Sequence, residues 1–288
     1  MKLVRFGPAG REKVGAIDRD GRLRDLSQAV PHLHLPTLGL SGLRRIERLA
    51  PETFPLARGR PRLGAPFTGI SKLVAIGLNY ADHAAEAGLP VPVEPIVFLK
   101  ATTCIQGPDD PIRLPPGSTR TDWEVELGVV IGRTARQVSV EQALAHVAGY
   151  CVVNDVSERE WQLERGGTWD KGKGFDSFGP LGPWLVTARE VPDPQALALW
   201  LDVNGQPRQR GSTATMVFGV AQLVSYVSRC MTLLPGDVIA TGTPPGVGMG
   251  MKPPQFLRAG DRVELGIAGL GRQRQRVIAQ AAKSAQAV

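Results

Sequence analysis

Beyond residue 70 the chain consists of short apolar runs separated by turns. Gly, Pro, Asn and Asp punctuate these runs, and short apolar runs with such boundaries are typical of β-strands. The runs cover residues 73–76, 96–99, 125–131, 151–153, 184–186, 199–203, 238–240, 263–267 and 277–279. We therefore expect this part of the chain to be rich in β-structure.

The N-terminal segment has a different pattern. Two short strands are predicted at residues 2–6 and 14–17, and a helix is predicted where apolar side chains recur every three residues, at Leu40, Leu43, Ile46 and Leu49. Residues 51–66 are rich in Pro, Arg and Gly without periodicity, so we interpret them as a linker. The pattern predicts a small domain at residues 1–66 and a larger one at residues 67–288.

Three helices are expected in the larger domain. The first covers residues 79–87, with Asn79 as N-cap and Gly88 as stop. The second covers residues 139–146 and begins with a capping box, formed by Ser139 and Gln142. The third covers residues 216–232 and ends before a proline. Because the strands do not alternate regularly with long helices, we expect a β-rich α+β fold and neither a Rossmann fold nor a barrel.

Composition agrees with a globular protein. The chain has 288 residues, 42% of them hydrophobic, which is enough to bury a sizeable core. The three cysteines form no CxxC pair, as expected in a reducing compartment. No apolar run approaches the 18 or so residues of a membrane span, and the N-terminus lacks a signal-peptide pattern. A cytoplasmic protein without membrane contact is the expectation.

The positive charge is confined to one segment. Residues 1–66 contain 13 Lys and Arg against 6 Asp and Glu, which accounts for the whole net charge of +7. Few aromatic residues lie among these basic ones, and the candidate chemistry lies elsewhere in the chain. A solvated basic face therefore explains the excess better than a nucleic-acid surface.

The apolar run at 125–131 begins with two carboxylates. Side chains alternate along a strand, so Glu124 and Glu126 point to the same face. Such a pair is either a solvated polar face or part of a cation site. Oxygen ligands without clustered His or Cys favour a hard cation, namely Mg²⁺, Mn²⁺ or Ca²⁺.

A second polar group follows the run at 151–153. Asp155 leaves this strand and could be a third metal ligand, and a helix starting near Ser157 would align it with Arg159 and Gln162. Arg159 could offer its planar fork to a carboxylate, and Gln162 its amide. Ordinary surface ion pairs are the alternative, and they suit the neighbouring acidic residues better, namely Glu158, Glu160 and Glu164.

Three further segments carry candidate chemistry. The glycine-rich loop at 166–180 holds Lys171 and Lys173, and a lysine there could bind an oxyanion or simply belong to a mobile loop. His83 and Glu86 are three residues apart on a predicted helix, so they could form a general-base pair or lie on the surface. Thr243 lies in a Gly/Pro turn that could bind a carboxylate.

Together, in this order, the segments resemble the fumarylacetoacetate hydrolase family over about 70% of the chain, from residue 70 to residue 279. The resemblance rests on NYADHAAE, FLKATT, GPDDPIRLP, DWEVELGVVIG, GYCVVNDVSER, WDKGKGFDSFGPLGPWLVT and ATGTPPGVG. They look most like the bacterial branch whose members carry names such as ureidoglycolate lyase and 2,4-dioxo-3-deoxy sugar acid hydrolase. The family implies a mixed β-roll catalytic domain, a small N-terminal domain and a homodimer.

The resemblance also implies roles for individual residues. The Mg²⁺ ligands would be Glu124, Glu126 and Asp155. A water-activating dyad on a mobile lid would be formed by His83 and Glu86, and the oxyanion donors would be Lys173 and Gln162. The substrate would be contacted by Arg159, Tyr80 and Thr243, the last at its carboxylate.

The expected reaction is Mg²⁺-dependent hydrolysis of a C–C bond in a 2,4-dioxo acid, releasing pyruvate or a homologue. The same enolate chemistry serves oxaloacetate decarboxylases, dienedioate isomerases, hydratases and ureidoglycolate lyases, so these stay as alternatives. A non-catalytic ligand-binding protein is the alternative from another class. The expected partner is a small 2-oxo acid, with no nucleic acid.

Overall fold

A computed structural model describes residues 1–86, 88 and 90–280. All nine apolar runs lie in strands, and two of these runs coincide with whole strands: β9 (Val125–Ile131) and β15 (Val238–Ala240). The β-rich α+β expectation is confirmed. Residues 281–288, part of the predicted larger domain, lie outside the described residues. None of the described helices is long and apolar enough to span a membrane.

The largest sheet has ten strands. Its order is β3-β2-β1-β12-β10-β9-β15-β4-β5, with β6 paired to β12. Besides β9 and β15, its strands are β1 (Lys2–Phe6), β2 (Lys13–Ile17), β3 (Leu23–Asp25), β4 (Leu73–Gly77), β5 (Ile96–Lys100), β6 (Ile105–Gln106), β10 (Val147–Asn154) and β12 (Gly179–Thr187).

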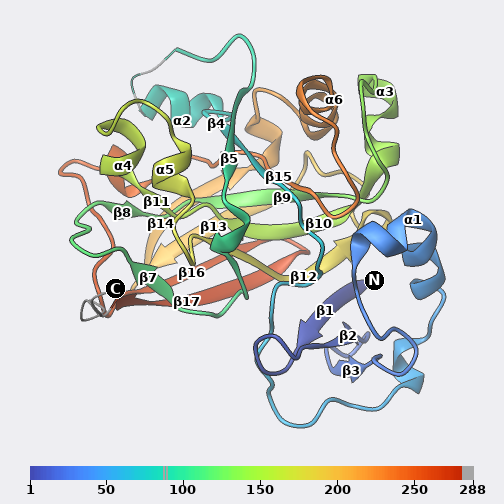
Figure 1. Cartoon of the computed structure of the whole chain (residues 1–288). Helices are drawn as coiled ribbons and strands as arrows, with labels where there is room; N and C mark the ends of the chain where they lie inside the picture. The colour runs from blue at the N-terminus through green and yellow to red at the C-terminus, as the bar shows by residue number, and fades with distance from the viewer. Residues whose placement is uncertain (87, 89, 281–288) are drawn as a thin grey trace, which may run out of the picture.

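A five-stranded sheet packs against β9, β10 and β12 of the large sheet, and the core lies between the two sheets (Figure 1). Its order is β14-β13-β16-β17-β7, and β8 and β11 form a separate pair. The strands are β7 (Ile112–Leu114), β8 (Thr121–Asp122), β11 (Ser157–Glu158), β13 (Ala198–Val203), β14 (Gln206–Ser212), β16 (Arg262–Ile267) and β17 (Gly271–Ala279).

The N-terminal strands continue the large sheet. β1 pairs antiparallel with β12, with Lys2 opposite Val186. Both predicted strands are present in β1 and β2, and Figure 1 shows them at the end of the molecule away from α4 and α5. The division into domains at residue 66 stays a prediction. Strands on either side of this boundary, β1 and β12, pair with each other.

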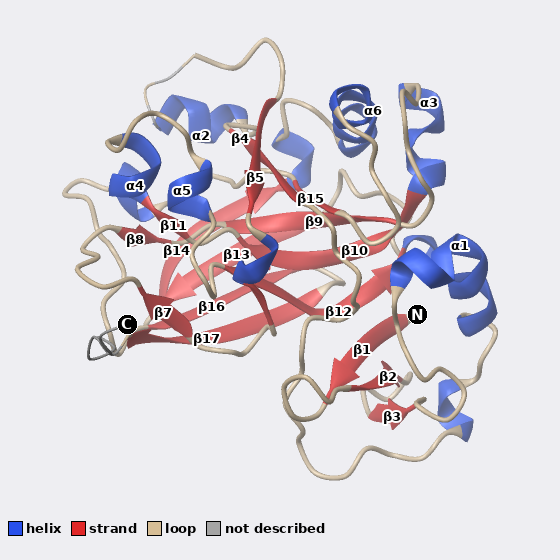
Figure 2. Ribbon diagram, viewed as in Figure 1, coloured by secondary structure: helices blue, strands red, loops and turns tan. Residues whose placement is uncertain are grey.

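The helices are short and lie outside the sheets (Figure 2). They are α1 (Leu35–Ile46), α2 (Ala81–Glu86), α3 (Val140–Ala143), α4 (Arg159–Leu163), α5 (Asp170–Lys173) and α6 (Val220–Cys230). Short 3-10 helices cover Pro51–Thr53, Thr102–Cys104, Leu144–His146, Ala188–Glu190, Thr213–Thr215 and Gly248–Gly250. α1 begins earlier than predicted and is interrupted at Gly39, whose φ of 52° is left-handed.

Two predicted helix caps are wrong. Ser139 precedes α3 but its side chain makes no capping hydrogen bond, so there is no capping box. Asn79 does not cap α2, since its amide donates to the carbonyls of Phe218 and Thr241 and accepts from Phe218 N. The end predicted for that helix, residue 87, lies outside the described residues. Local sequence identifies polar residues suited to caps, but tertiary partners compete for them.

Candidate functional site

Three buried carboxylates meet where β9 and β10 lie side by side. Antiparallel pairing sets Glu126 opposite Val153, and the N–H of Asp155 donates to the carbonyl of Glu124 at 2.9 Å. The side chains of Glu124, Glu126 and Asp155 each offer an oxygen within 4.8 Å of the others. Strand register therefore brings together the three residues that the sequence analysis proposed as metal ligands.

Lysine ammonium groups lie between these carboxylates. Lys173, at the end of α5, places Nζ 2.8 Å from both Glu124 Oε2 and Asp155 Oδ2. The glycine-rich loop is thus partly helical, and its other lysine, Lys171, is exposed and bonds to a backbone carbonyl. Lys100, at the end of β5, lies 2.5 Å from Asp155 Oδ1. The sequence analysis missed Lys100; the available signal was a lysine that ends an apolar strand.

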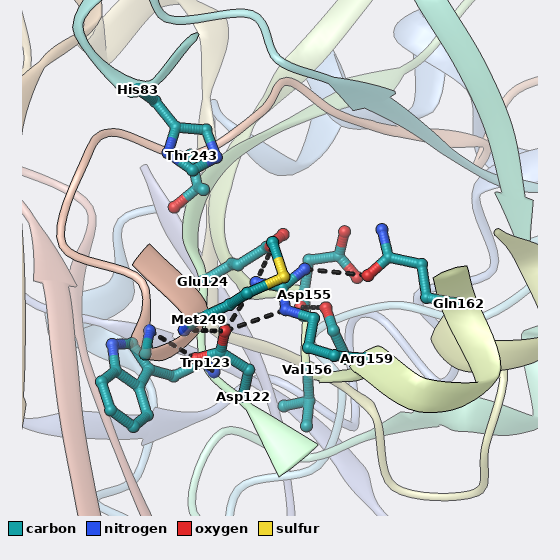
Figure 3. A network of polar contacts seen from close by, with 12 residues as sticks. His83, Asp122, Trp123, Glu124, Asp155, Val156, Arg159, Gln162, Thr243 and Met249 are labelled. Carbon is teal, nitrogen blue, oxygen red and sulfur yellow. Dashed lines mark hydrogen bonds and ion pairs between the residues drawn. The ribbon is translucent and has the colours of Figure 1, made fainter. Parts of the chain in front are cut away.

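The fork of Arg159 is occupied by carboxylates of the protein itself (Figure 3). Its Nε donates to Asp122 Oδ2 at 2.9 Å, and Nη2 lies 2.7 Å from Glu124 Oε1, within ion-pair distance but without hydrogen-bond geometry. Nη1 donates to Gln162 Oε1 at 2.9 Å. The proposed single helical stripe is wrong, because Asp155 precedes β11 and α4 begins only at Arg159.

Glu158 also departs from expectation. It is buried and accepts a hydrogen bond from Thr121 at 2.9 Å, so it is not part of a surface ion pair. Glu160 and Glu164 do form exposed pairs, with Arg165 and Arg120. Strand β11 turns Glu158 inward, an outcome that a helix starting at Ser157 does not predict.

The cluster contains one more carboxyl group than cations. Four buried carboxylates face three buried cations, namely Asp122, Glu124, Glu126 and Asp155 against Lys100, Arg159 and Lys173. Burial acts to raise the pKa of Glu124, but Lys173 and Arg159 outweigh it and lower that pKa to about 2. At Glu126 burial and the charges of Asp155 and Glu124 together raise the pKa well above its usual value.

This donor set fits a hard divalent cation. All three candidate ligands are carboxylates, which Mg²⁺, Mn²⁺ and Ca²⁺ prefer. The only hydrogen bond of the Glu126 side chain among the described residues comes from the N–H of Gly242, at 2.9 Å. A cation there would offset the burial and the repulsion that together raise the pKa of Glu126.

His83 and Glu86 form the pair that their spacing predicted. His83 is buried, and its Nδ1 lies 3.1 Å from Glu86 Oε2. Glu86 also accepts the N–H of Gly246 at 2.9 Å, so the carboxylate ties α2 to the loop after β15. The carboxylate therefore orients the imidazole and leaves Nε2 for other partners. Whether this helix acts as a lid stays a prediction.

Two residues that were expected to contact the substrate have other surroundings. One is hydrogen-bonded within the protein, and the other is buried away from the cavity. The hydroxyl of Thr243 donates to the carbonyl of Val125 at 2.9 Å and accepts from Gln209 at 2.7 Å, so its proton is used within the fold. Tyr80 is buried and does not line the cavity described below; its hydroxyl has no hydrogen-bond partner in the described part of the chain. Burial, followed by the charges of Glu126 and Asp82, raises the pKa of Tyr80.

A cavity of about 520 Å³ opens onto these groups, a volume within the range of roughly 300–1,000 Å³ that small-molecule sites have. Its polar lining contains most of the predicted site residues, namely His83, Glu86, Glu124, Glu126, Arg159, Gln162, Lys173 and Thr243. The rest of the lining is mainly apolar. The arrangement can thus hold a cation and orient a base beside an apolar surface.

The chain is similar to known proteins over most of its length. The model named Fumarylacetoacetate (FAA) hydrolase C-terminal matches residues 72–278. A protein of Burkholderia lata, named only "Putative hydrolase", is 64% identical over 276 residues, which are 96% of this chain and 98% of that protein.

Three solved structures are similar along nearly their whole length. Fumarylacetoacetate hydrolase from Exiguobacterium antarcticum has a TM-score of 0.86 and 38% identity, covering 97% of this chain and 100% of that one. A 5-carboxymethyl-2-hydroxymuconate delta-isomerase from Mycobacterium smegmatis has 0.75 and 35%, covering 98% and 100%. A maleylpyruvate hydrolase from Sphingobium sp. SYK-6, in complex with manganese(II) and pyruvate, has 0.79 and 29%, covering 97% and 99%.

Proposed function

The chain belongs to the fumarylacetoacetate hydrolase family, and from that premise we propose that it hydrolyses a carbon–carbon bond of a 2,4-dioxo acid. The products are pyruvate, or a homologue, and a carboxylic acid. The observation that carries the proposal is a buried cluster of three carboxylates beside the cavity that the His83–Glu86 pair lines. The maleylpyruvate hydrolase named above, with its manganese and pyruvate, supports it.

A divalent cation, for which we propose Mg²⁺, would be held by Glu124, Glu126 and Asp155. When bound, it would supply positive charge that stabilises a 2-oxo acid and an enolate leaving group. Mn²⁺ is the alternative that a neighbouring structure supports.

His83 is the proposed general base. Glu86 holds Nδ1, so Nε2 accepts the proton of a water that attacks the distal carbonyl carbon. The carbon–carbon bond to the enolate fragment then breaks, and the enolate carbon takes up a proton to give the 2-oxo acid product.

Lys173 and Gln162 are the proposed oxyanion donors. Lys173 uses two of its three N–H groups on Glu124 and Asp155, which leaves one for the oxyanion. Arg159 holds the amide oxygen of Gln162, so the amide NH₂ is left to donate. Arg159 acts by orienting Gln162 and Glu124, because its own fork is occupied.

The second candidate reaction is isomerisation of an unsaturated dioate, favoured by the similarity to an isomerase. It needs the same enolate site but no attacking water. We also propose a homodimer that acts in the cytoplasm on a small 2-oxo acid and binds no nucleic acid.

The deciding experiment is turnover. Purified protein with Mg²⁺ or Mn²⁺ is given acylpyruvates, oxaloacetate, a dienedioate and ureidoglycolate, and product is followed by chromatography. Release of pyruvate from acylpyruvates, at a rate well above the other substrates, supports hydrolysis. Preference for oxaloacetate, the dienedioate or ureidoglycolate assigns the corresponding alternative, and no turnover of any of them favours a binding protein.

A further inference from the structure

Besides its polar groups, the cavity has an apolar wall. Phe98 and Trp169 form part of this wall, and their ring centroids are 5.3 Å apart in an edge-to-face arrangement. Leu78, Met249 and Met251 line the cavity as well. We use the name "apolar wall" for these five side chains.

The wall begins beside the proposed oxyanion donor. The ammonium of Lys173 lies 5.2 Å from the centroid of the Phe98 ring. A carbonyl that receives a hydrogen bond from Lys173 therefore lies near Phe98, and its substituent can extend along this ring toward Trp169. In a 2,4-dioxo acid this substituent is the acyl chain.

Two backbone features maintain the wall. Trp169 lies directly on Gly77, where a Cβ would be only 2.3 Å from the indole ring. Leu78 has a φ of 51°, a left-handed conformation that costs a non-glycine residue energy. Asn79 fixes this conformation through hydrogen bonds with Phe218 and Thr241. The fold thus tolerates strain to direct a leucine side chain at the cavity.

Charges give a second, independent indication. Two cations of the lining, Arg159 and Lys173, are already engaged with buried carboxylates. The third cation of the lining, Lys252, is exposed to solvent. A second carboxylate on the substrate would have to lose water against the apolar wall or reach Lys252, and unpaired burial of a charge is strongly unfavourable.

We infer that the substrate is an acylpyruvate whose acyl group is apolar, alkyl or aryl, and that Leu78 and Trp169 select it. The inference rests on the proposed hydrolysis and specifies its substrate class. Burial of each additional methylene against the wall should raise kcat/KM about fourfold, until the chain fills the cavity.

The test compares substrates that differ only in their acyl chain. 2,4-Dioxo acids with methyl, propyl and pentyl acyl ends are assayed beside one whose pentyl end carries a terminal carboxylate. We expect kcat/KM to rise with chain length and the terminal carboxylate to lower it at least about tenfold. A preference for the terminal carboxylate that Lys252→Ala removes would overturn the inference while leaving the hydrolase proposal intact.

Variants identify the residues that select the chain. Trp169→Ala and Leu78→Ala should lose most of the dependence on chain length, through KM more than kcat, and Trp169→Phe should retain part of it. Trp161→Ala is the matched control, because Trp161 packs on Phe175 and does not line the cavity. If Trp169→Ala lowered kcat/KM equally for all chain lengths, the residue would be structural and the inference wrong.

A binding measurement separates the two proposals. Thermal unfolding is followed with Mn²⁺ and either 2-oxooctanoate or the 2-oxo dioate of equal length, neither of which can be hydrolysed. Larger stabilisation by the monoacid supports the apolar wall even if no 2,4-dioxo acid is turned over, a result that would refute only the proposed hydrolysis. Larger stabilisation by the dioate contradicts the apolar-wall inference directly.

Discussion

Lys100 and Asp155 form a fully buried ion pair, with Nζ 2.5 Å from Oδ1. Lys100 also donates to the carbonyl of Val156 at 3.1 Å. Lys100, which the sequence analysis did not identify, thus holds one carboxylate of the proposed metal site in place.

Removal of one partner of a buried pair leaves an uncompensated charge. Lys100→Met should therefore lower the free energy of unfolding by about 3 kcal/mol, measured by urea denaturation. Lys13→Met is the control: Lys13 pairs with Asp25 on the surface, and its loss should cost less than about 1 kcal/mol. If the two variants were equally stable, Lys100 would not balance the charge of Asp155.

Metal binding should depend on Glu126. Mg²⁺ or Mn²⁺ should raise the Tm of the protein, because a ligand of the folded state alone stabilises it, and oxalate should raise it further. Glu126→Gln should abolish both shifts, whereas Glu164→Gln, on the surface, should keep them. Full activity in excess EDTA after dialysis would refute the metal assignment.

Loss of the base should impair catalysis but leave metal binding intact. His83→Ala should lower kcat by about 10²–10⁴, the usual contribution of a general base, with an unchanged metal-induced shift in Tm. His32→Ala, at an exposed position, serves as the control. An unchanged kcat would exclude water activation by His83 and favour a reaction without an attacking water.

Asp18 should make stability depend on acid pH. Burial acts to raise its pKa, but hydrogen bonds from the backbone of Arg22 and the side chains of Arg24 and Arg22 outweigh it and lower the pKa to about 2. A lowered folded-state pKa gives stability that is complete above about pH 4 and is lost as the pH falls toward 2.

The test compares wild type with Asp18→Asn by urea unfolding. The variant should be less stable at about pH 6, and the difference should shrink toward about pH 2.5, where the unfolded-state carboxyl is protonated. Asp20→Asn, at an exposed neighbour, controls for loss of one negative charge. A difference that is constant over this range would show that the ion pairs of Asp18 do not contribute.

The basic N-terminal segment should bind DNA weakly. Several of its arginines form ion pairs within the protein, among them Arg5 with Glu12, Arg24 with Asp18, and Arg62 with Asp110. We expect a Kd of about 10⁻⁴ M or weaker for a labelled duplex at physiological salt, by fluorescence anisotropy. Micromolar binding that survives this salt concentration would restore the nucleic-acid interpretation.

The sequence alone determined many of the strands and part of the site. Alternation along β9 set Glu124 and Glu126 on one face, and helical spacing joined His83 to Glu86; both relationships are local in the chain. Apolar runs likewise identified nine strands, because their hydrophobic pattern does not depend on the partner strand.

Tertiary structure decided which polar groups meet across long separations. Gln209, on the polar strand β14, accepts the N–H of Val125 and donates to Thr243, and these bonds span 84 and 34 residues. The carboxylate of Asp122 accepts hydrogen bonds from the N–H groups of Gly248 and Met249. Such partners depend on sheet order and register, which the hydrophobic pattern of one chain does not specify. For the same reason the sequence left Lys100 unassigned and assigned Arg159 to the substrate, although the fold engages its fork with the protein's own carboxylates.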